Sequence, residues 1–313
     1  PIITSIKCCI HDGFVYFPNL KQNREYLFYI FSGGELYKGL GKTGTQLNLN
    51  TYTVGEIKTP IPPLHEQKAI ASFLDKETAR IDDLVEKKER LLKLLKEKRT
   101  ALISHAVTKG LDPNVAMKDS GIEWLGEIPG HWEVKRLKSV VLQIGSGKTP
   151  KGGSQIYSSS GVIFLRSQNI HFEGLRLGDV VYIDNAIDRE MAHSRVKPGD
   201  VLLNITGASL GRCHFIPKDF PPANVNQHVC IIRPNDRLLE SAFLFALIAS
   251  NMVQAQIFSS ENGTSREGLT FSQIADLVLS IPPLAEQKAI ASHLDQETLK
   301  LDNLMEKIRQ SIA

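Results

Sequence analysis

The chain has 313 residues, of which 42% are hydrophobic and 23% are charged, and its formal net charge is +3. Such a chain forms two or three domains, and its composition excludes wholesale disorder and a collagen-like structure. The longest apolar run, 242–249, is too short to cross a membrane, and no secretory leader pattern opens the chain, so we expect a cytoplasmic protein. The cysteines fit that reduced compartment, because no C-x-x-C spacing joins Cys8, Cys9, Cys213 and Cys230.

One block of the sequence occurs twice. Residues 61–87 and 281–307 are identical at 19 of 27 positions with an offset of 220, and both begin Ile-Pro-Pro-Leu-x-Glu-Gln. A weaker similarity lies upstream of each block, where Tyr26–Ile30 resembles Phe243–Leu247. A period of this length indicates a duplicated domain with its connector rather than a solenoid.

Each repeated block is predicted to be a long helix. The Pro-Pro pair is tolerated only before or within the first turn, so the helices should begin near Leu64 and Leu284. Leucine and isoleucine then recur at close to heptad spacing, which is typical of a coiled-coil seam, and Gly110 followed by Pro113 ends the first helix. Because each apolar stripe must be buried, we predict an antiparallel pair of the two helices. The alternative is that each helix packs separately on its own domain.

Short apolar runs separated by Gly, Asn and Pro follow the first helix. Residues 111–130 have a linker-like composition, and a helix is expected around residues 241–258. The predicted strands lie between them, at 140–142, 162–165, 180–183, 201–203 and 229–232. The fold class is therefore mixed α/β, with β-rich domains joined by the long repeated helices.

A search for catalytic motifs finds none that holds. Gly145-Ser146-Gly147-Lys148-Thr149 resembles the end of a phosphate-binding loop, but Leu142 stands where the first glycine belongs and Pro150 opposes the required helix. No adenine-gripping methyltransferase tetrapeptide, metal-ligand spacing or nucleophile elbow is convincing. We therefore predict a protein that is not an enzyme, without a cofactor or metal.

Polar loops next to the predicted strands carry the remaining signal. Arg, Asn and Gln side chains form bidentate pairs with guanine and adenine, and a glycine-rich basic loop can contact phosphates. The alternative is that these residues close turns by bonding to their own backbone. Between residues 133 and 280 there are 15 Lys or Arg and 13 Asp or Glu, so bulk charge neither demands nor forbids a nucleic acid. The candidate DNA-binding residues are Lys148, Lys151, Arg166, Gln168, Asn169, Asn204, Thr206, Ser209, Arg212, Asn226, Gln227 and Arg266.

Several segments together resemble the specificity subunits of type I restriction–modification systems. They are 118–133 (KDSGIEWLGEIPGHWE), 197–207 (KPGDVLLNITG), Gly211-Arg212, Asn226-Gln227-His228 and the two Ile-Pro-Pro-Leu-x-Glu-Gln blocks. The resemblance implies target recognition domains that each read half of a split DNA sequence. It also implies an antiparallel coiled coil that sets the spacing and docks adenine methyltransferase subunits. Methylation and cleavage would belong to the methyltransferase and restriction subunits, and the specificity subunit would do no chemistry.

The expected organisation follows from the repeat and the resemblance. Compared with the family, the first recognition domain is expected to be truncated, so we also expect self-association of the chain. The rival hypothesis is a coiled-coil assembly scaffold that does not bind DNA. The expected parts are a remnant of the first recognition domain (1–60), the first coiled-coil helix (61–110), a linker (111–130), an intact second recognition domain (131–280) and a truncated second helix (281–313).

Overall fold

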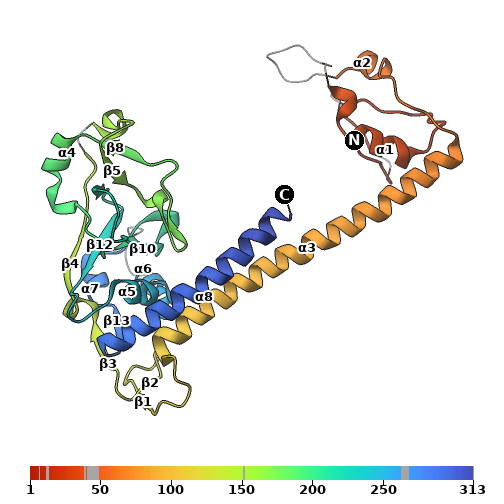
Figure 1. The fold of residues 1–313 in the computed structure, drawn as a ribbon. Helices are drawn as coiled ribbons and strands as arrows, with labels where there is room; N and C mark the ends of the chain where they lie inside the picture. Colours follow the sequence, from red (N-terminus) through yellow and green to blue (C-terminus); the bar gives the residue numbers. More distant parts are fainter. Residues whose placement is uncertain are drawn as a thin grey trace. The chain divides into compact units, whose positions relative to one another are not determined.

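A computed structural model describes residues 1–6, 8–11, 14–38, 40, 49–150, 152–261 and 268–312. The chain divides into two compact units, residues 1–91 and residues 92–311. Helix α3 (Leu64–Lys109) begins in the first unit and ends in the second (Figure 1). Its first residue directly follows the Pro-Pro pair, and the second long helix, α8 (Leu284–Gln310), begins in the same way. Both predicted helix starts are therefore confirmed.

The first unit packs helix α1 (Arg24–Ser32) near the start of α3. The side chain of Tyr26 is buried, and its hydroxyl donates to the carbonyl of Pro60 at 3.0 Å. Asn23 caps α1 by accepting a hydrogen bond from the Tyr26 N–H. The unit also contains the turn η1 (Glu35–Tyr37) and the short helix α2 (Thr51–Gly55).

The second unit contains a four-stranded sheet in the order β10-β9-β12-β4 and a three-stranded sheet in the order β11-β5-β8. Neighbours in the first sheet are antiparallel, whereas β11 and β5 are parallel and β5 and β8 are antiparallel. Smaller pairs are β1-β2, β3-β13 and β6-β7. The strands are β1 (Met117–Asp119), β2 (Glu127–Pro129), β3 (Glu133–Arg136), β4 (Val141–Ser146), β5 (Val162–Leu165), β6 (Ile170–His171), β7 (Gly174–Leu175), β8 (Val181–Ile183), β9 (Val201–Asn204), β10 (Cys213–Phe215), β11 (Ala223–Val225), β12 (Val229–Pro234) and β13 (Val278–Ile281).

The central strands of the larger sheet are buried on both faces. Along β9 and β12 the side chains alternate, as a strand requires. Leu202 and Ile231 join a core with residues of the three-stranded sheet, whereas Leu203 and Ile232 join a larger core that includes the helices. Burial on both faces explains why these strands read as continuous apolar runs. The helices of this unit other than α3 and α8 are α4 (Asn185–Glu190), α5 (Ser241–Ala249), α6 (Asn251–Glu261) and α7 (Phe271–Ala275).

The helix expected around residues 241–258 is in fact two helices. Ser250 adopts an extended conformation and separates α5 from α6. Its hydroxyl donates to the Leu247 carbonyl at 2.6 Å and accepts from the Val253 N–H at 3.4 Å, so one side chain serves the ends of both helices. Among the described residues, no single helix is both long and apolar enough to cross a membrane. Taken together, α5 and α6 are long and apolar enough, but they are bent by 62° relative to each other.

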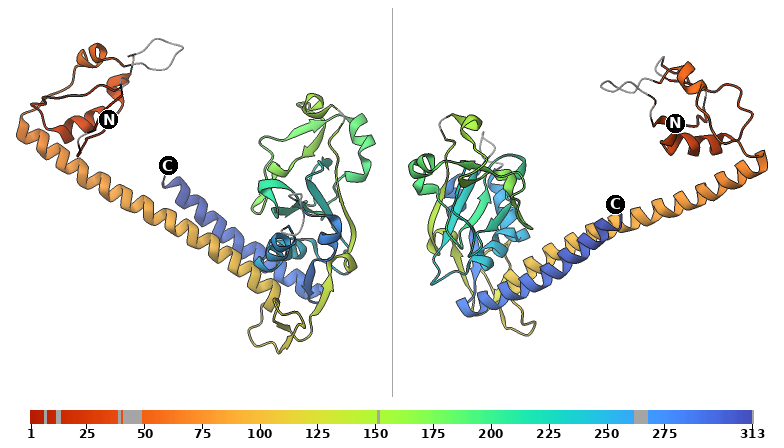
Figure 2. Two further views of the ribbon diagram at one scale, coloured as in Figure 1. Left: turned by 180° about the vertical axis from the view of Figure 1, so that it is seen from behind. Right: turned by 45° about the horizontal axis from the view of Figure 1, so that its top comes forward.

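Helix α8 runs antiparallel to the last part of α3. The hydroxyl of Ser280, just before α8, donates to the carbonyl of Val107 near the end of α3 at 3.1 Å. Farther along α8, Asp302 pairs with Arg99, which lies earlier in α3, at 3.3 Å. The views in Figure 2 agree with this arrangement. The predicted antiparallel pair is thus confirmed for the part of α3 in the second unit.

The sequence repeat has a structural counterpart in each unit. In the first unit, Gln67 Oε1 accepts from the N–H of Asn23, the residue that caps α1, at 2.8 Å. In the second, Gln287 Oε1 accepts from the N–H of Glu240, the residue that caps α5, also at 2.8 Å. The glutamines are 220 residues apart and the capping residues 217 apart. Tyr26 and Phe243, both buried, therefore occupy equivalent places, as the upstream similarity predicted.

The segment 111–130, expected to be a linker, contains the hairpin formed by β1 and β2. The side chains of Leu125 and Ile128 are buried in the same core as the end of α3. This segment is therefore packed rather than merely connecting.

Candidate nucleic-acid interface

The strand order gathers the predicted polar loops at one end of the second unit. In the antiparallel sheet, the ends of β4 and β9 and the starts of β10 and β12 lie at the same end. The parallel pair β5 and β11 brings two more strand ends together. Hydrogen bonds join the two sheets here, from Asn226 N–H to Leu165 O at 3.1 Å and from Gly147 N–H to Asn226 O at 3.2 Å. We call residues 147–150, 166–169, 205–212 and 226–228 the loop cluster.

Close backbone approaches hold the loop cluster together. A Cβ atom on Gly147 would lie 1.6 Å from the carbonyl oxygen of Val225, so only glycine allows β4 to pass this close to β11. Gly268 lies against Thr206, and the N–H of Leu269 donates to the Ile205 carbonyl at 2.9 Å. The chain that follows residues 262–267 therefore packs on the cluster. Arg266 itself, like Lys151, lies outside the described residues.

The loop after β5 is organised by Asn169 and Asp179. Asn169 is fully buried: its Oδ1 accepts from Arg166 N–H at 2.9 Å, and its Nδ2 donates to Arg176 O at 2.9 Å and to Asp179 Oδ1 at 3.0 Å. The amide of Gln168, an exposed residue, donates to the same Asp179 carboxylate. The expectation that Asn169 contacts DNA is therefore corrected, because its amide atoms are buried and engaged within the loop.

Arg166 is the half-buried cation of this loop. Its Nη2 donates to the Asp179 carbonyl at 2.8 Å, and its guanidinium lies 5.9 Å from the centre of the Tyr157 ring. Its Nε is buried and has no hydrogen-bond partner among the described residues. The side chain is thus held in place by two contacts, and other N–H groups of its guanidinium remain available to a ligand.

The loop after β9 is tied to the loop after β5. Asn204 is fully buried, and its Nδ2 donates to the carbonyl of Ser167 at 2.7 Å. This residue also needs a correction, because it links two loops from the interior and does not reach the surface. Thr206 Oγ1 lies 2.6 Å from Nδ1 of His228, which connects this loop to the next one. Ser209 and Arg212, farther along the same loop, are half-buried.

The loop before β12 contains both a turn residue and an exposed amide. Asn226 Oδ1 accepts from the N–H of His228 at 3.1 Å, which matches the alternative interpretation that this asparagine closes a turn. Gln227 is exposed; its Oε1 accepts from the Thr149 hydroxyl, and its Nε2 lies 2.9 Å from His228 Nε2. Lys148 is exposed beside Thr149. An exposed amide therefore contacts the residue next to an exposed lysine, although the two loops are far apart in the sequence.

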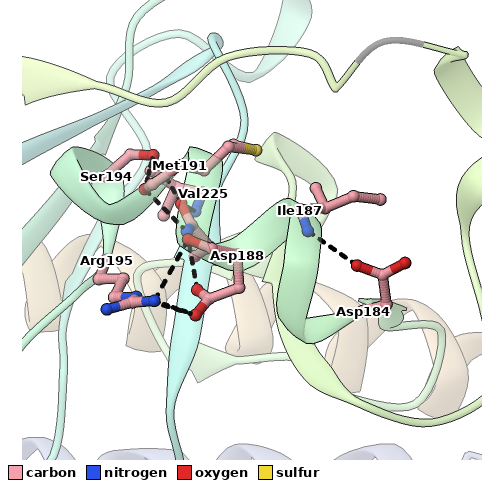
Figure 3. A network of polar contacts seen from close by, with 8 residues as sticks. Asp184, Ile187, Asp188, Met191, Ser194, Arg195 and Val225 are labelled. Carbon is pink, nitrogen blue, oxygen red and sulfur yellow. Dashed lines mark hydrogen bonds and ion pairs between the residues drawn. The ribbon is translucent and has the colours of Figure 1, made fainter.

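A buried polar network supports β11, which leads into this last loop (Figure 3). Asn224 Nδ2 donates to Asp188 Oδ1 and to Met191 O, both at 3.1 Å, and Asn224 Oδ1 accepts from the Ser194 hydroxyl at 2.6 Å. Arg195 Nε donates to the other Asp188 oxygen at 2.9 Å, and this contact raises the pKa of the guanidinium. Asn224 therefore has a structural role.

Two residues outside the loop cluster, which the sequence did not predict, position its side chains. Asp179 contacts Arg166, Gln168 and Asn169, and Tyr157 lies beside Arg166, but each has the appearance of an ordinary loop residue in a single sequence. Burial disfavours the thiolate form of the two buried cysteines: it raises the pKa of Cys213 and raises that of Cys230 to about 12. Within the described ranges, no group of three or more His, Cys, Asp or Glu side chains is arranged to hold a metal ion.

A family model decides the relationship of this chain to known proteins. The model, described as the type I restriction modification DNA specificity domain, matches residues 2–94 and 129–313. The chain belongs to this family. It is 27% identical over 285 residues to the type I restriction enzyme MjaVIII specificity subunit of Methanocaldococcus jannaschii, covering 90% of this chain and 64% of that protein. It is 25% identical over 276 residues to the EcoBI specificity subunit of Escherichia coli, covering 86% of this chain and 57% of that protein.

A solved structure supports the same fold. A chain from work on the complex assembly and conformational transition of the type I R-M system superposes with a TM-score of 0.68 at 19% identity, covering 93% of this chain and 67% of that chain. The chain spans less than two thirds of the length of the curated relatives named above. The predicted family and the mixed α/β fold class with its packed long helices are therefore confirmed.

Proposed function

We propose that this chain reads DNA sequence for a type I restriction–modification complex and does so with the loop cluster. The observation that carries the proposal is the convergence of four polar loops at one end of the second unit, inside a segment that the family model matches. The cluster presents amide, hydroxyl and cationic groups, which are the groups that pair with base edges and phosphates.

Burial divides the candidate residues into roles. Arg166, Gln168, Arg212 and Gln227 have at least part of their side chains at the surface and are the proposed base contacts. Thr206 and Ser209 line the same cluster and are proposed to add hydroxyl contacts. Asn169, Asn204 and Asn226 hold the loops in place. Lys148, together with Lys151 and Arg266 outside the described residues, is proposed to contact the phosphate backbone.

The proposed partners are double-stranded DNA and the methyltransferase and restriction subunits of the complex. The chain would supply no catalytic group, and the antiparallel pair of α3 and α8 would serve the methyltransferase subunits as a docking surface. The near-neutral charge of the recognition unit agrees with this division, because partner subunits can share the phosphate contacts. The reading unit is proposed to select one half of a split target.

Sequence selection from a randomised duplex library tests the proposal. The full chain is incubated with type I methyltransferase subunits, and bound duplexes are recovered over a series of salt concentrations and sequenced. We expect one short sequence pattern to be enriched. Equal recovery of all sequences would refute sequence reading, and no recovery at any salt concentration would support the scaffold that does not bind DNA.

Three alanine variants connect the result to the loop cluster. Arg166→Ala should relax the selected pattern at one position, at a cost of about 1–3 kcal/mol for the preferred base. Lys148→Ala should weaken binding to all sequences about equally and reduce the salt dependence by about one counterion. Lys218 is a matched control, because this exposed lysine lies between β10 and β11 at the opposite end of the sheets. If Lys218→Ala weakens binding as much as Lys148→Ala, the loop cluster is not the interface.

A further inference from the structure

A half-open cavity of about 540 Å³ lies in the second unit, where α5, α8 and β10 meet the end of α3. Its apolar wall includes Phe215, Phe245 and Ala246, and its polar wall on α8 includes Asp295 and Thr298. The rings of Phe215 and Phe245 lie 5.7 Å apart, so the wall can accept another aromatic ring. The loop cluster does not contribute to this cavity, which is therefore separate from the proposed DNA contact.

The first unit shows what fills the equivalent place in the other copy of the repeat. There the hydroxyl of Tyr29, on α1, donates to Asp75 Oδ1 at 2.7 Å and lies 3.2 Å from Thr78 Oγ1, both on α3. Thus a phenol group bridges the helix before the Pro-Pro motif and the long helix after it.

The matching positions in the second unit are identified by the repeat. An offset of 220 relates Asp75 to Asp295 and Thr78 to Thr298. The offset of 217, fixed by the capping residues Asn23 and Glu240, relates Tyr29 to Ala246. The carboxylate and the hydroxyl are thus present in both units, whereas the phenol is present only in the first.

The threonine hydroxyl makes the same backbone contact in both units. Thr298 Oγ1 donates to the Leu294 carbonyl at 2.7 Å, just as Thr78 Oγ1 donates to the Leu74 carbonyl at 2.8 Å. Asp295 is exposed at the mouth of the cavity. The exchange of Tyr for Ala therefore removes a ring and its hydroxyl but leaves the residues that would accept them.

We propose that this cavity binds a phenol group. The phenol hydroxyl donates to the Asp295 carboxylate beside Thr298, and the ring packs on Ala246 and Phe245. A tyrosine side chain of a partner protein and a free phenolic compound share this chemistry. The site is independent of DNA binding, so the proposal does not rest on the function proposed above.

Ligand binding to the full chain tests the proposal, with p-cresol as the probe and toluene as its analogue without the hydroxyl. We expect p-cresol to bind at least about tenfold more tightly than toluene, because a hydrogen bond to a charged acceptor is worth about that factor or more. Asp295→Ala should remove this preference. Asp75→Ala is the matched control in the first unit and should leave p-cresol affinity unchanged. Equal affinities for p-cresol and toluene, or no effect of Asp295→Ala, would overturn the proposal.

A variant that supplies the ring covalently gives a second test. Ala246→Tyr should raise the midpoint of thermal unfolding and abolish p-cresol binding, whereas Ala255→Tyr, on an exposed position of α6, should do neither. Retained p-cresol binding in folded Ala246→Tyr would contradict the assignment of the site. N-acetyl-tyrosinamide tests the two sources: if it binds as p-cresol does, the site accepts a partner's tyrosine, and if only p-cresol binds, a partner's tyrosine is excluded and the ligand is a free phenol.

Discussion

Gln287 is predicted to be a principal polar contact between α8 and the rest of the second unit. Its side chain is fully buried and makes three hydrogen bonds: Oε1 accepts from Glu240 N–H at 2.8 Å, and Nε2 donates to Leu238 O and Pro282 O, each at 2.9 Å. Replacement by leucine keeps a similar volume but removes all three bonds. At about 1 kcal/mol net for each bond, and more if the partners stay unsatisfied, the loss should be about 3–5 kcal/mol.

The first unit provides an internal comparison for this prediction. Gln67 is also buried but makes two such bonds, from Asn23 N–H to its Oε1 and from its Nε2 to Pro62 O, each at 2.8 Å. Gln67→Leu should therefore cost about 2 kcal/mol and should act on the first unit.

Tryptophan fluorescence during urea unfolding separates the two effects. Both tryptophans of the chain, Trp124 and Trp132, lie in the second unit, and Trp132 is fully buried. Gln287→Leu should shift the fluorescence transition to lower urea at an unchanged slope, whereas Gln67→Leu should leave it in place and shift a transition seen only by circular dichroism. A cost below about 1 kcal/mol for Gln287→Leu would refute the reasoning, because three satisfied buried bonds cannot be removed so cheaply.

Three further predictions concern stability and the loop cluster. Arg233 forms a bidentate pair with Asp200, whose side chain is 1% exposed; Nε and Nη2 each lie 2.7 Å from a carboxylate oxygen. Asp200→Ala should therefore lower the unfolding free energy measured in urea by about 3–5 kcal/mol. Burial lowers the pKa of His214 from 6.5 to about 4. Between these pH values the unfolded chain binds a proton that the folded chain does not. The unfolding free energy should therefore fall by no more than about 3 kcal/mol as the pH drops from 6.5 to 4. A His214→Phe variant that kept the same pH dependence would contradict this assignment. Gly147→Ala should lower the unfolding free energy by at least about 2 kcal/mol and weaken DNA binding, since its Cβ would overlap the Val225 carbonyl; an unchanged DNA affinity would show that this crossing does not shape the interface.

The sequence could predict the two long helices and the central buried strands because their signals are local. The Pro-Pro pairs determine where α3 and α8 begin, and the heptad spacing predicts that the helices pair. The division of residues 241–258 into two helices escaped prediction, because Ser250 caps both helix ends through contacts that a serine in an apolar run does not reveal. The helix propensity of this run was therefore overridden by the Ser250 hydroxyl, which bonds to backbone groups of both helices.

The candidate site was predicted less completely, because the sequence does not show the orientation of the loop side chains. Composition places Asn169, Asn204 and Gln227 in polar loops, but it does not say which side chain turns inward. A loop packed between two sheets has backbone groups that need partners, and a buried asparagine amide can satisfy up to four of them. Asn169 and Asn204 meet that need, and Gln227 remains at the surface. Residue type therefore predicted which loops are polar, and packing determined which of their side chains remain at the surface for the proposed interface.

The repeated motif acts through two residues that depend on different segments. In the second unit, Gln287 contacts the start of α5, whereas Glu286 accepts from Trp132 Nε1 at 3.1 Å and lies 2.7 Å from His131 Nε2. In the first unit, Gln67 keeps the equivalent contact with α1, but Glu66 is exposed. The glutamine thus contacts the helix that precedes the motif, whereas the glutamate contacts the distant residues His131 and Trp132. One motif therefore joins both segments to the start of α8, and we expect a motif variant to alter the proposed DNA selection without contacting DNA.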